Sequence, residues 1–141
     1  MKDLSGSIIL ITGAAGNIGS AIARYITEHF SNCRIVCVDN MYNGSIDNLY
    51  FKYNLNNKVE LLCERQYDIG LLNKHFFEDK FDYIFHQASL LTLDSAKYRD
   101  YAIRTNIVGF TNICELALRD EAKLIFASSA SVYGNPTILP T

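Results

Sequence analysis

The 141-residue sequence predicts an α/β fold, a doubly wound parallel sheet truncated after about five strands. Apolar runs of strand length recur along the chain, and continuous runs of this kind are typical of strands buried on both faces of a parallel sheet. Segments with apolar residues at helical spacing separate most of these runs. Parallel strands joined in this way need crossover connections, which are right-handed. We therefore expect a Rossmann-type fold.

The expected elements alternate between strands and helices along the whole chain. In chain order they are a strand at Ile8–Ile11, a helix at about Asn17–Phe30, a strand at about Arg34–Asp39, a short helix near Ile46–Tyr53, a strand at Val59–Cys63, a helix marked by Leu71, Leu72, His75 and Phe76, a strand at Tyr83–Ala88, a long helix at about Asp94–Arg119 and a strand at Lys123–Ser129.

Composition narrows the class of protein. Hydrophobic residues make up 49% of the chain and charged residues 20%, as in one globular domain of this length. The net charge is −2 and the 13 basic residues are scattered, so nothing indicates nucleic-acid binding. The apolar runs are too short for a membrane span. Met1–Gly6 lacks a signal-peptide pattern, and we expect a cytoplasmic protein.

Cysteine and histidine do not suggest a metal site. The four cysteines have no C-x-x-C spacing, and most lie in or beside apolar strand or helix patterns, so we expect buried thiols. None of the three histidines pairs with a cysteine or carboxylate at a metal-ligand spacing. We expect no bound metal.

A glycine-rich turn follows the first strand. Gly13, Gly16 and Gly19 recur at spacings of three, and apolar residues at helical period come next. Such a turn lets a pyrophosphate approach the backbone, while free N–H groups and the helix dipole face the anion. The last glycine allows close packing of helix on strand. The spacing differs from the usual G-x-G-x-x-G, and an ordinary strand-to-helix turn remains an alternative.

The second strand ends in an acidic residue, at a position typical of dinucleotide-binding sites. Asp39 lies twenty positions after Gly19, where a ribose 2′-hydroxyl needs an acceptor. No Arg or Lys occurs between Asp39 and Phe51 to hold a 2′-phosphate, which favours NAD over NADP.

Other polar residues also follow the expected strands. Asp68, Gln87–Ser89 and Ser128–Ser131 lie at carboxyl ends, as Gly13 and Asp39 do. In an open α/β sheet, ligands bind at this edge.

These motifs, taken together, resemble the extended short-chain dehydrogenase/reductases, in particular the NAD-dependent nucleotide-sugar epimerase/dehydratase family. The order and rough spacing of the matching segments are those of the family, and they extend over nearly the whole chain. The segments are Thr12–Gly19, Val38–Asn40, Tyr67–Ile69, Phe85–Ser89, Thr105–Gly109 and Ala127–Gly134.

The resemblance implies NAD as the cofactor. It implies that Asp39 binds the adenosine ribose, that Asp68 accepts the exocyclic amine of adenine, and that Asn106 braces the loop after strand four. Without the surrounding pattern, Asp68 and Asn106 fit helix caps or turn residues equally well. The residues implied to bind the cofactor are Gly13, Gly16, Asn17, Ile18, Gly19, Asp39, Asn40, Asn43, Asp68, Ile69, Gln87, Ala88, Ser89 and Asn106.

Ser129 matches the active-site hydroxyl of the family, which would hydrogen-bond the substrate during hydride transfer. Neighbouring Ser128 and Ser131 are alternatives for this assignment. Dehydratases of the family carry an Asp-Glu pair next in the chain, and this sequence has Ala130 and Ser131 there, which cannot transfer protons at neutral pH. Epimerase chemistry, the oxidation and re-reduction of a sugar C4 hydroxyl as in UDP-glucose 4-epimerase, is therefore favoured.

The Tyr-x-x-x-Lys motif of the family does not occur in this sequence, in which no tyrosine has a lysine four residues later. We therefore expect residues 1–141 to be an incomplete NAD-binding Rossmann domain without the C-terminal substrate domain, and inactive alone. The full-length protein would act on a nucleotide sugar and form a homodimer through the long helix Asp94–Arg119. A catalytically silent NAD-binding module, a dehydratase fragment and a partly folded fragment are the alternatives.

Overall fold

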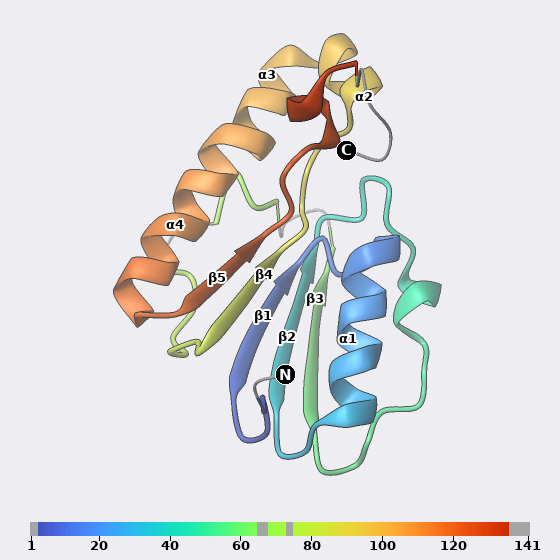
Figure 1. Ribbon diagram of the computed structural model, residues 1–141, viewed down its shortest axis with the longest axis vertical. Coiled ribbons are helices and arrows are strands. Elements are labelled where there is room, and N and C mark those ends of the chain that lie inside the picture. The colour runs from blue at the N-terminus through green and yellow to red at the C-terminus, as the bar shows by residue number, and fades with distance from the viewer. Residues whose placement is uncertain (1–2, 65–67, 73–74, 136–141) are drawn as a thin grey trace.

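Five parallel strands form one sheet in a computed structural model that describes residues 3–64, 68–72 and 75–135 (Figure 1). The order across the sheet is β3-β2-β1-β4-β5, which confirms the predicted fold class. The strands are β1 (Ile8–Thr12), β2 (Arg34–Asp39), β3 (Lys58–Cys63), β4 (Tyr83–His86) and β5 (Lys123–Phe126).

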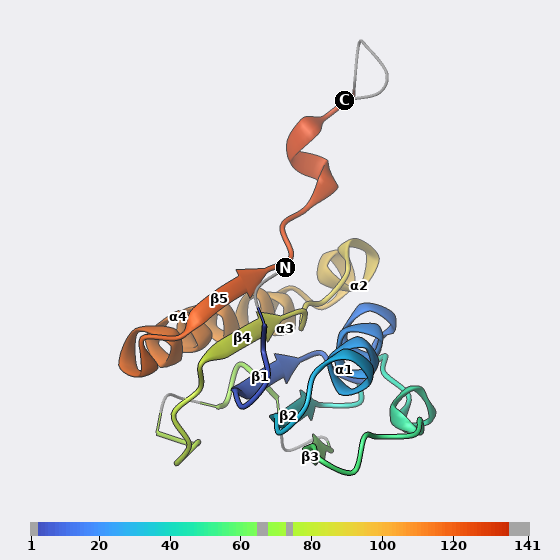
Figure 2. The same cartoon turned by 60° about the horizontal axis from the view of Figure 1, so that its bottom comes forward.

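Helices cover the two faces of the sheet in separate layers (Figure 2). Alternate residues of β1 point to opposite faces, as the pleat requires. Ile9 and Ile11 pack in the core cluster that includes Ile26 of helix α1 (Asn17–His29), whereas Leu10 packs in the cluster that includes Ile113 of helix α4 (Gly109–Asp120). Chain order runs outward from β1 in both directions, so the switch point of the sheet lies between β1 and β4.

The long helix expected at Asp94–Arg119 is divided in the structure. Helix α2 (Thr92–Lys97) ends at Tyr98, whose backbone leaves the helical region at φ −121° and ψ 67°. Helix α3 (Arg99–Ala102) then leads into the π-helix η2 (Ile103–Val108), and α4 follows. The expectation of one uninterrupted helix was wrong. The spacing of apolar residues continues across Tyr98 and the π-helix, so it does not reveal that the backbone leaves the regular α-helix there.

None of the described residues around Leu71–Phe76, where a helix was expected, is helical. The described residues of 68–80 make turns and bends. Leu72, Phe77 and Phe81 are buried at spacings of five and four, which do not follow one helical face. The Arg119 guanidinium, moreover, donates to the carbonyls of Phe77 (2.8 Å) and Asp79 (2.7 Å). These tertiary contacts, rather than a helical hydrogen-bond ladder, hold the segment.

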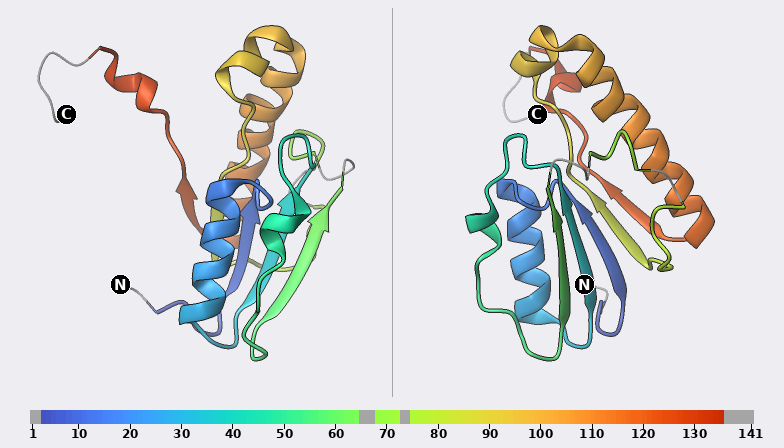
Figure 3. Two further views of the ribbon diagram at one scale, coloured as in Figure 1. Left: turned by 90° about the vertical axis from the view of Figure 1, so that its right-hand side faces the viewer. Right: turned by 180° about the vertical axis from the view of Figure 1, so that it is seen from behind.

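Two 3₁₀ turns complete the described elements. The short helix expected near Ile46–Tyr53 is the single turn η1 (Ile46–Leu49). After β5 the chain leaves the sheet and carries η3 (Ala130–Tyr133) away from the body of the domain, as the views in Figures 2 and 3 agree. No helix among the described residues is long and apolar enough to cross a membrane.

Candidate functional site

A pocket of about 520 Å³ lies at the carboxyl ends of the strands, the edge toward which the arrowheads point in Figure 1. The turn after β1, the loops after β2 and β4, the α3–η2 segment and the residues after β5 all contribute to it. The pocket therefore occupies the switch point, where open α/β sheets bind ligands. No lysine, arginine or histidine is among its described lining residues.

The glycine turn forms the floor of the pocket at the start of α1. Gly13 has φ +66°, and a Cβ there would lie 2.7 Å from the backbone nitrogen of Ala88. A Cβ on Gly19 would lie 2.2 Å from the carbonyl oxygen of Gly13, so only glycine lets the helix sit this close to the turn. Gly16 is the N-cap of α1 and provides no side-chain cap. The first N–H groups of the helix consequently have no intrahelical acceptor and can bind an anion.

Asp39 is buried at the side of the pocket, with 8% of its surface exposed. One carboxylate oxygen accepts a hydrogen bond from Ala15 N at 3.0 Å, and the other accepts one from Met41 N at 2.8 Å. Gly44 approaches so closely that a Cβ there would lie 3.1 Å from both carboxylate oxygens. The carboxylate is thus fixed in position, and each oxygen keeps a lone pair for a ligand hydroxyl.

The loop after β2 is tied to the α2–α3 segment across the pocket. Asn43 Nδ2 donates to Asp94 Oδ2 at 3.4 Å, and the rings of Tyr42 and Tyr101 lie with centroids 5.3 Å apart. Asn40 Nδ2 donates to the Tyr101 hydroxyl at 2.5 Å. These contacts join segments some 50 to 60 positions apart and close this end of the pocket.

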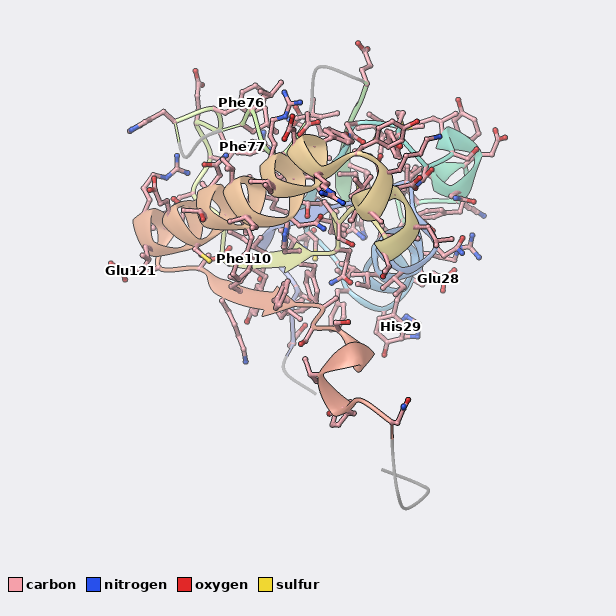
Figure 4. The ribbon with its side chains drawn as sticks, turned by 90° about the horizontal axis from the view of Figure 1, so that it is seen from above. Glu28, His29, Phe76, Phe77, Phe110 and Glu121 are labelled. Atoms are coloured by element: carbon pink, nitrogen blue, oxygen red, sulfur yellow. The ribbon has the colours of Figure 1, made fainter. Side chains whose placement is uncertain are left out.

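Thr12 and His86 stand behind the loop after β4. Thr12 Oγ1 and His86 Nδ1 are hydrogen bonded at 2.7 Å, and Ala88 N donates to Thr12 Oγ1 at 3.3 Å. Burial lowers the pKa of His86 to about 4, so the ring is neutral near pH 7. Phe110, which projects from α4 toward the sheet in Figure 4, and Phe126 lie against the ring at centroid distances of 5.7 and 6.0 Å.

Asn106 braces the same loop from η2, as the resemblance implied. Its Oδ1 accepts a hydrogen bond from Leu90 N at 2.7 Å, and its Nδ2 donates to Leu90 O at 3.0 Å. A side-chain amide can satisfy a backbone N–H and C=O at the same time in this way. The brace holds the loop that lines the pocket, although Asn106 itself is not a lining residue.

Most of the site residues expected from the sequence meet in the pocket. Asp68 and Asn106 lie behind its wall, and Ser129 is exposed and outside the lining, whereas the alternative Ser128 is a lining residue. The expected residues that do line the pocket are Gly13, Gly16, Asn17, Ile18, Gly19, Asp39, Asn40, Asn43, Ile69, Gln87, Ala88 and Ser89.

Several lining residues were not expected. Thr105 has a signal in the sequence, because it precedes Asn106 in one of the matching segments, and its hydroxyl is buried without a hydrogen-bond partner among the described residues. Tyr101 has no local signal, since only the fold brings α3 to the pocket. The lining residues that were not expected are Thr12, Val38, Tyr42, Gly44, Asn48, Leu90, Leu91, Tyr101, Thr105 and Ala127.

The cysteines lie outside this pocket. All four are free, and burial raises the pKa of Cys37 to about 12 and that of Cys63 to about 11, so these two thiols stay protonated at neutral pH. The described residues contain no group of three or more His, Cys, Asp or Glu placed to hold a metal ion.

The sheet order, the glycine turn and the pocket at the switch point define the chain as a domain of the Rossmann class. Residues 9–141 match the family model described as NAD dependent epimerase/dehydratase family, and the chain belongs to that family.

Similar proteins include epimerases of known name. The chain is 34% identical to a UDP-glucose 4-epimerase of Yersinia enterocolitica, over 94% of this chain and 40% of the relative. It is similar to the solved UDP-glucose 4-epimerase of Thermotoga maritima, with 28% identity, a TM-score of 0.75, and 95% and 42% of the two chains covered. A Bordetella bronchiseptica enzyme solved in complex with NAD is 26% identical, with a TM-score of 0.73 and coverages of 96% and 41%.

Coverage is asymmetric in each of these comparisons. Nearly all of this chain is matched, but the chain spans only about 40% of the length of these relatives. The similarity therefore concerns one part of the related proteins.

Proposed function

We propose that this chain binds NAD in the pocket and is the cofactor-binding part of a nucleotide-sugar epimerase. The single observation that best supports this is the placement of Asp39 beside the start of α1, which has no side-chain cap. Its carboxylate is held in position by two backbone N–H groups, and no basic side chain is among the described residues that line the pocket. A pyrophosphate at the helix start and a ribose at the carboxylate together match the two halves of an adenosine diphosphate.

The pocket residues suggest a direction for the bound dinucleotide. The N–H groups of Asn17 and Ile18 would hold the pyrophosphate, and Asp39 the adenosine ribose, with Asn40 and Asn43 beside it. The adenine would extend toward Ile69 and the buried Asp68. The loop Gln87, Ala88 and Ser89 would take the nicotinamide ribose side, nearer β5, because it lies across the switch point from β2.

The proposed reaction of the full-length protein is the oxidation of a sugar C4 hydroxyl and the return of the hydride to the other face. NAD, when bound, accepts and returns that hydride. In this chain Ser129 or its neighbour Ser128 would hydrogen-bond the sugar oxygen and hold it in place. Ser128 lines the pocket and Ser129 is exposed in this arrangement, so we treat the pair together.

The residues that follow Ser129 favour epimerisation over dehydration as the proposed reaction. Elimination of water needs an additional acid and base, and Ala130 and Ser131 stand where dehydratases of the family carry Asp and Glu. The similar proteins include UDP-glucose 4-epimerases but also UDP-glucuronic acid decarboxylases and a dTDP-D-glucose 4,6-dehydratase, so this choice rests on the sequence, while their names suggest a nucleotide sugar as substrate. We place the substrate-binding domain outside residues 1–141, and we expect this chain alone to bind the cofactor without turning over substrate.

A second copy of the chain is the proposed partner. Ile103 (53% exposed), Ile107 (60%) and Leu118 (80%) are the apolar members of an exposed row along η2 and α4, in which the exposed Thr111 and Glu115 separate Ile107 from Leu118. Because large apolar side chains in one row are costly to leave in water, such a row favours a protein interface. The division at Tyr98 moves the proposed interface from Asp94–Arg119 to η2 and α4.

The test is a calorimetric titration of the chain with NAD and with NADP. We expect NAD to bind and NADP to bind more weakly. Asp39→Ala should weaken NAD binding about tenfold or more, because a charge-assisted hydrogen bond contributes about 1.5–3 kcal/mol. The same substitution should also reduce the difference in affinity between NAD and NADP. Asp100→Asn, a change at an exposed acid outside the lining, is the matched control. No detectable NAD binding by the unaltered chain would refute the proposal.

A further inference from the structure

Ile69 forms part of the pocket wall and is held from behind by helix α4. It is 4% exposed and is one of the described residues that line the pocket. It lies in a turn in which the N–H groups of Leu71 and Leu72 both donate to the carbonyl of Asp68, at 2.8 and 3.2 Å. The Ile69 carbonyl takes no part in these two bonds and instead accepts a hydrogen bond from Asn112 Nδ2 at 3.2 Å. A residue of the pocket wall is therefore held by a side chain 43 positions away.

Two close approaches bring the same turn against η2 and α4. A Cβ on Gly109, the first residue of α4, would lie 2.6 Å from Ile69 Cγ2. A Cβ on Gly70 would lie 2.6 Å from the carbonyl oxygen of Arg104 in η2. A larger residue at either glycine would push the turn away from the helices. The position of Ile69 therefore depends on its contacts with η2 and α4.

Asn112 lies on the side of α4 that faces this turn. It follows Gly109 by three residues, a spacing that places both on one face of a helix. The next residue, Ile113, is buried in the core cluster that also contains Ile69. Asn112 itself is half-buried and is not among the described residues that line the pocket. Its amide can consequently act on a ligand only through the residues that it holds.

We propose that Asn112 is a positioning residue for the cofactor, which holds the Ile69 carbonyl and thereby fixes the wall against which the adenine packs. The proposal rests on NAD binding in this pocket with its adenine toward Ile69. Without the Asn112 amide, the Ile69 backbone loses a hydrogen bond to α4, and a ligand has to order this part of the wall when it binds. Ordering of a loop at a binding site reduces the affinity. The loss should be confined to the adenosine half of the cofactor.

The test is a calorimetric titration with NAD and with ADP, which carries only the adenosine diphosphate half. Asn112→Ala should weaken both ligands by the same factor, about fivefold, because the hydrogen bond that fixes the wall is lost. Asn112→Asp keeps the shape of the side chain but removes the donor, and it should weaken both at least as much. Gly109→Ala should weaken both through a different contact, since its Cβ would push on the Ile69 side chain. Thr111→Ala is the matched control, because this exposed hydroxyl donates back to the Ile107 carbonyl, and it should change neither affinity.

Asn106→Ala separates positioning from a general loss of stability. It releases the loop after β4, on the proposed nicotinamide side, so it should weaken NAD and leave the affinity for ADP unchanged. An equal loss of ADP affinity in Asn106→Ala and Asn112→Ala would indicate a general defect and overturn the positioning role. A loss for NAD without a loss for ADP in Asn112→Ala would overturn it as well.

A double variant tests whether Asn112 acts through Ile69. Ile69→Ala removes the apolar wall, so in this background Asn112→Ala should weaken ADP by no more than about twofold. The full fivefold loss in the Ile69→Ala background would show that Asn112 acts by another route and would overturn the proposal.

The outcomes also distinguish this positioning role from the proposed function. If the unaltered chain binds neither NAD nor ADP, the proposed function is refuted and the positioning role with it. If the unaltered chain binds NAD but not ADP, or if Asn112→Ala and Asn112→Asp leave both affinities unchanged, only the positioning role is refuted.

Discussion

Thr12 and His86 are register partners on adjacent strands and are joined side chain to side chain by a hydrogen bond of 2.7 Å. The bond lies at the last pair of the β1–β4 ladder, where the chain enters the two loops that line the pocket. Thr12 Oγ1 also receives the Ala88 N–H, so one hydroxyl connects both strands to the loop after β4. The switch point is therefore held by a neutral polar network at its base.

This network predicts a loss of stability in acid. Burial lowers the pKa of His86 from its usual 6.5 to about 4. Below pH 6.5 the unfolded chain takes up a proton that the folded chain resists, so stability should fall as pH drops from about 6.5 to 4, by up to roughly 3 kcal/mol from this residue. Urea unfolding at several pH values measures the slope.

Two variants test that assignment. His86→Gln should be less stable at pH 7 but should show a shallower decline between pH 6.5 and 4.5. The matched control is His29→Gln at an exposed histidine, labelled in Figure 4, and it should keep the slope of the unaltered chain. An unchanged slope in His86→Gln would show that other groups cause the acid sensitivity.

Gly19→Ala should destabilise the fold and impair cofactor binding together. The new Cβ would lie 2.2 Å from the Gly13 carbonyl oxygen, which is backbone and cannot rotate away, so α1 must move from the turn. We expect a loss of about 2–3 kcal/mol in the free energy of unfolding, in the range found for overpacked sites. At Gly16 the equivalent Cβ would lie 3.3 Å from the same oxygen, so Gly16→Ala should cost clearly less. Similar losses from the two changes would contradict this explanation.

Asn106→Ala should release the loop after β4. The change removes both hydrogen bonds to the Leu90 backbone, and we expect a loss of about 1–2 kcal/mol in stability and a several-fold weaker affinity for NAD. Asn56→Ala, in an exposed turn, serves as the control and should have neither effect. Hydrogen exchange of the Leu90 amide reports directly on the brace, and protection that survives in Asn106→Ala would show that other contacts hold the loop.

The exposed row on η2 and α4 predicts self-association. Ile107→Glu and Leu118→Glu each place a charge in the proposed interface, so both should shift the chain toward monomer in sedimentation velocity experiments at high concentration. Leu55→Glu provides the control, because Leu55 is 99% exposed and lies outside the row. A monomeric unaltered chain at high concentration would rule out this interface.

The local sequence pattern was sufficient to predict those features that depend on one short segment alone. The buried strands, the glycine turn and the acid at the end of β2 could be predicted because each depends on the period of a short segment or on backbone that only glycine tolerates. The same parallel order also brings strand ends to one edge, so most of the pocket lining followed from the predicted topology.

Only the tertiary structure decided the features that depend on contacts between distant segments. The described residues around Leu71–Phe76 are not helical, and Arg119 binds the carbonyls of Phe77 and Asp79 just after them. Apolar spacing along one segment does not reveal such a distant partner. Tyr101 reaches the pocket because α3 crosses the loop after β2, and Asp68 is covered by Asn40 from another strand end. The sequence by itself therefore determined the sheet and the glycine turn, because these follow from local period and spacing, and its motifs carried the resemblance to the family. Which side chains face the pocket was decided by packing between segments some 30 to 60 positions apart.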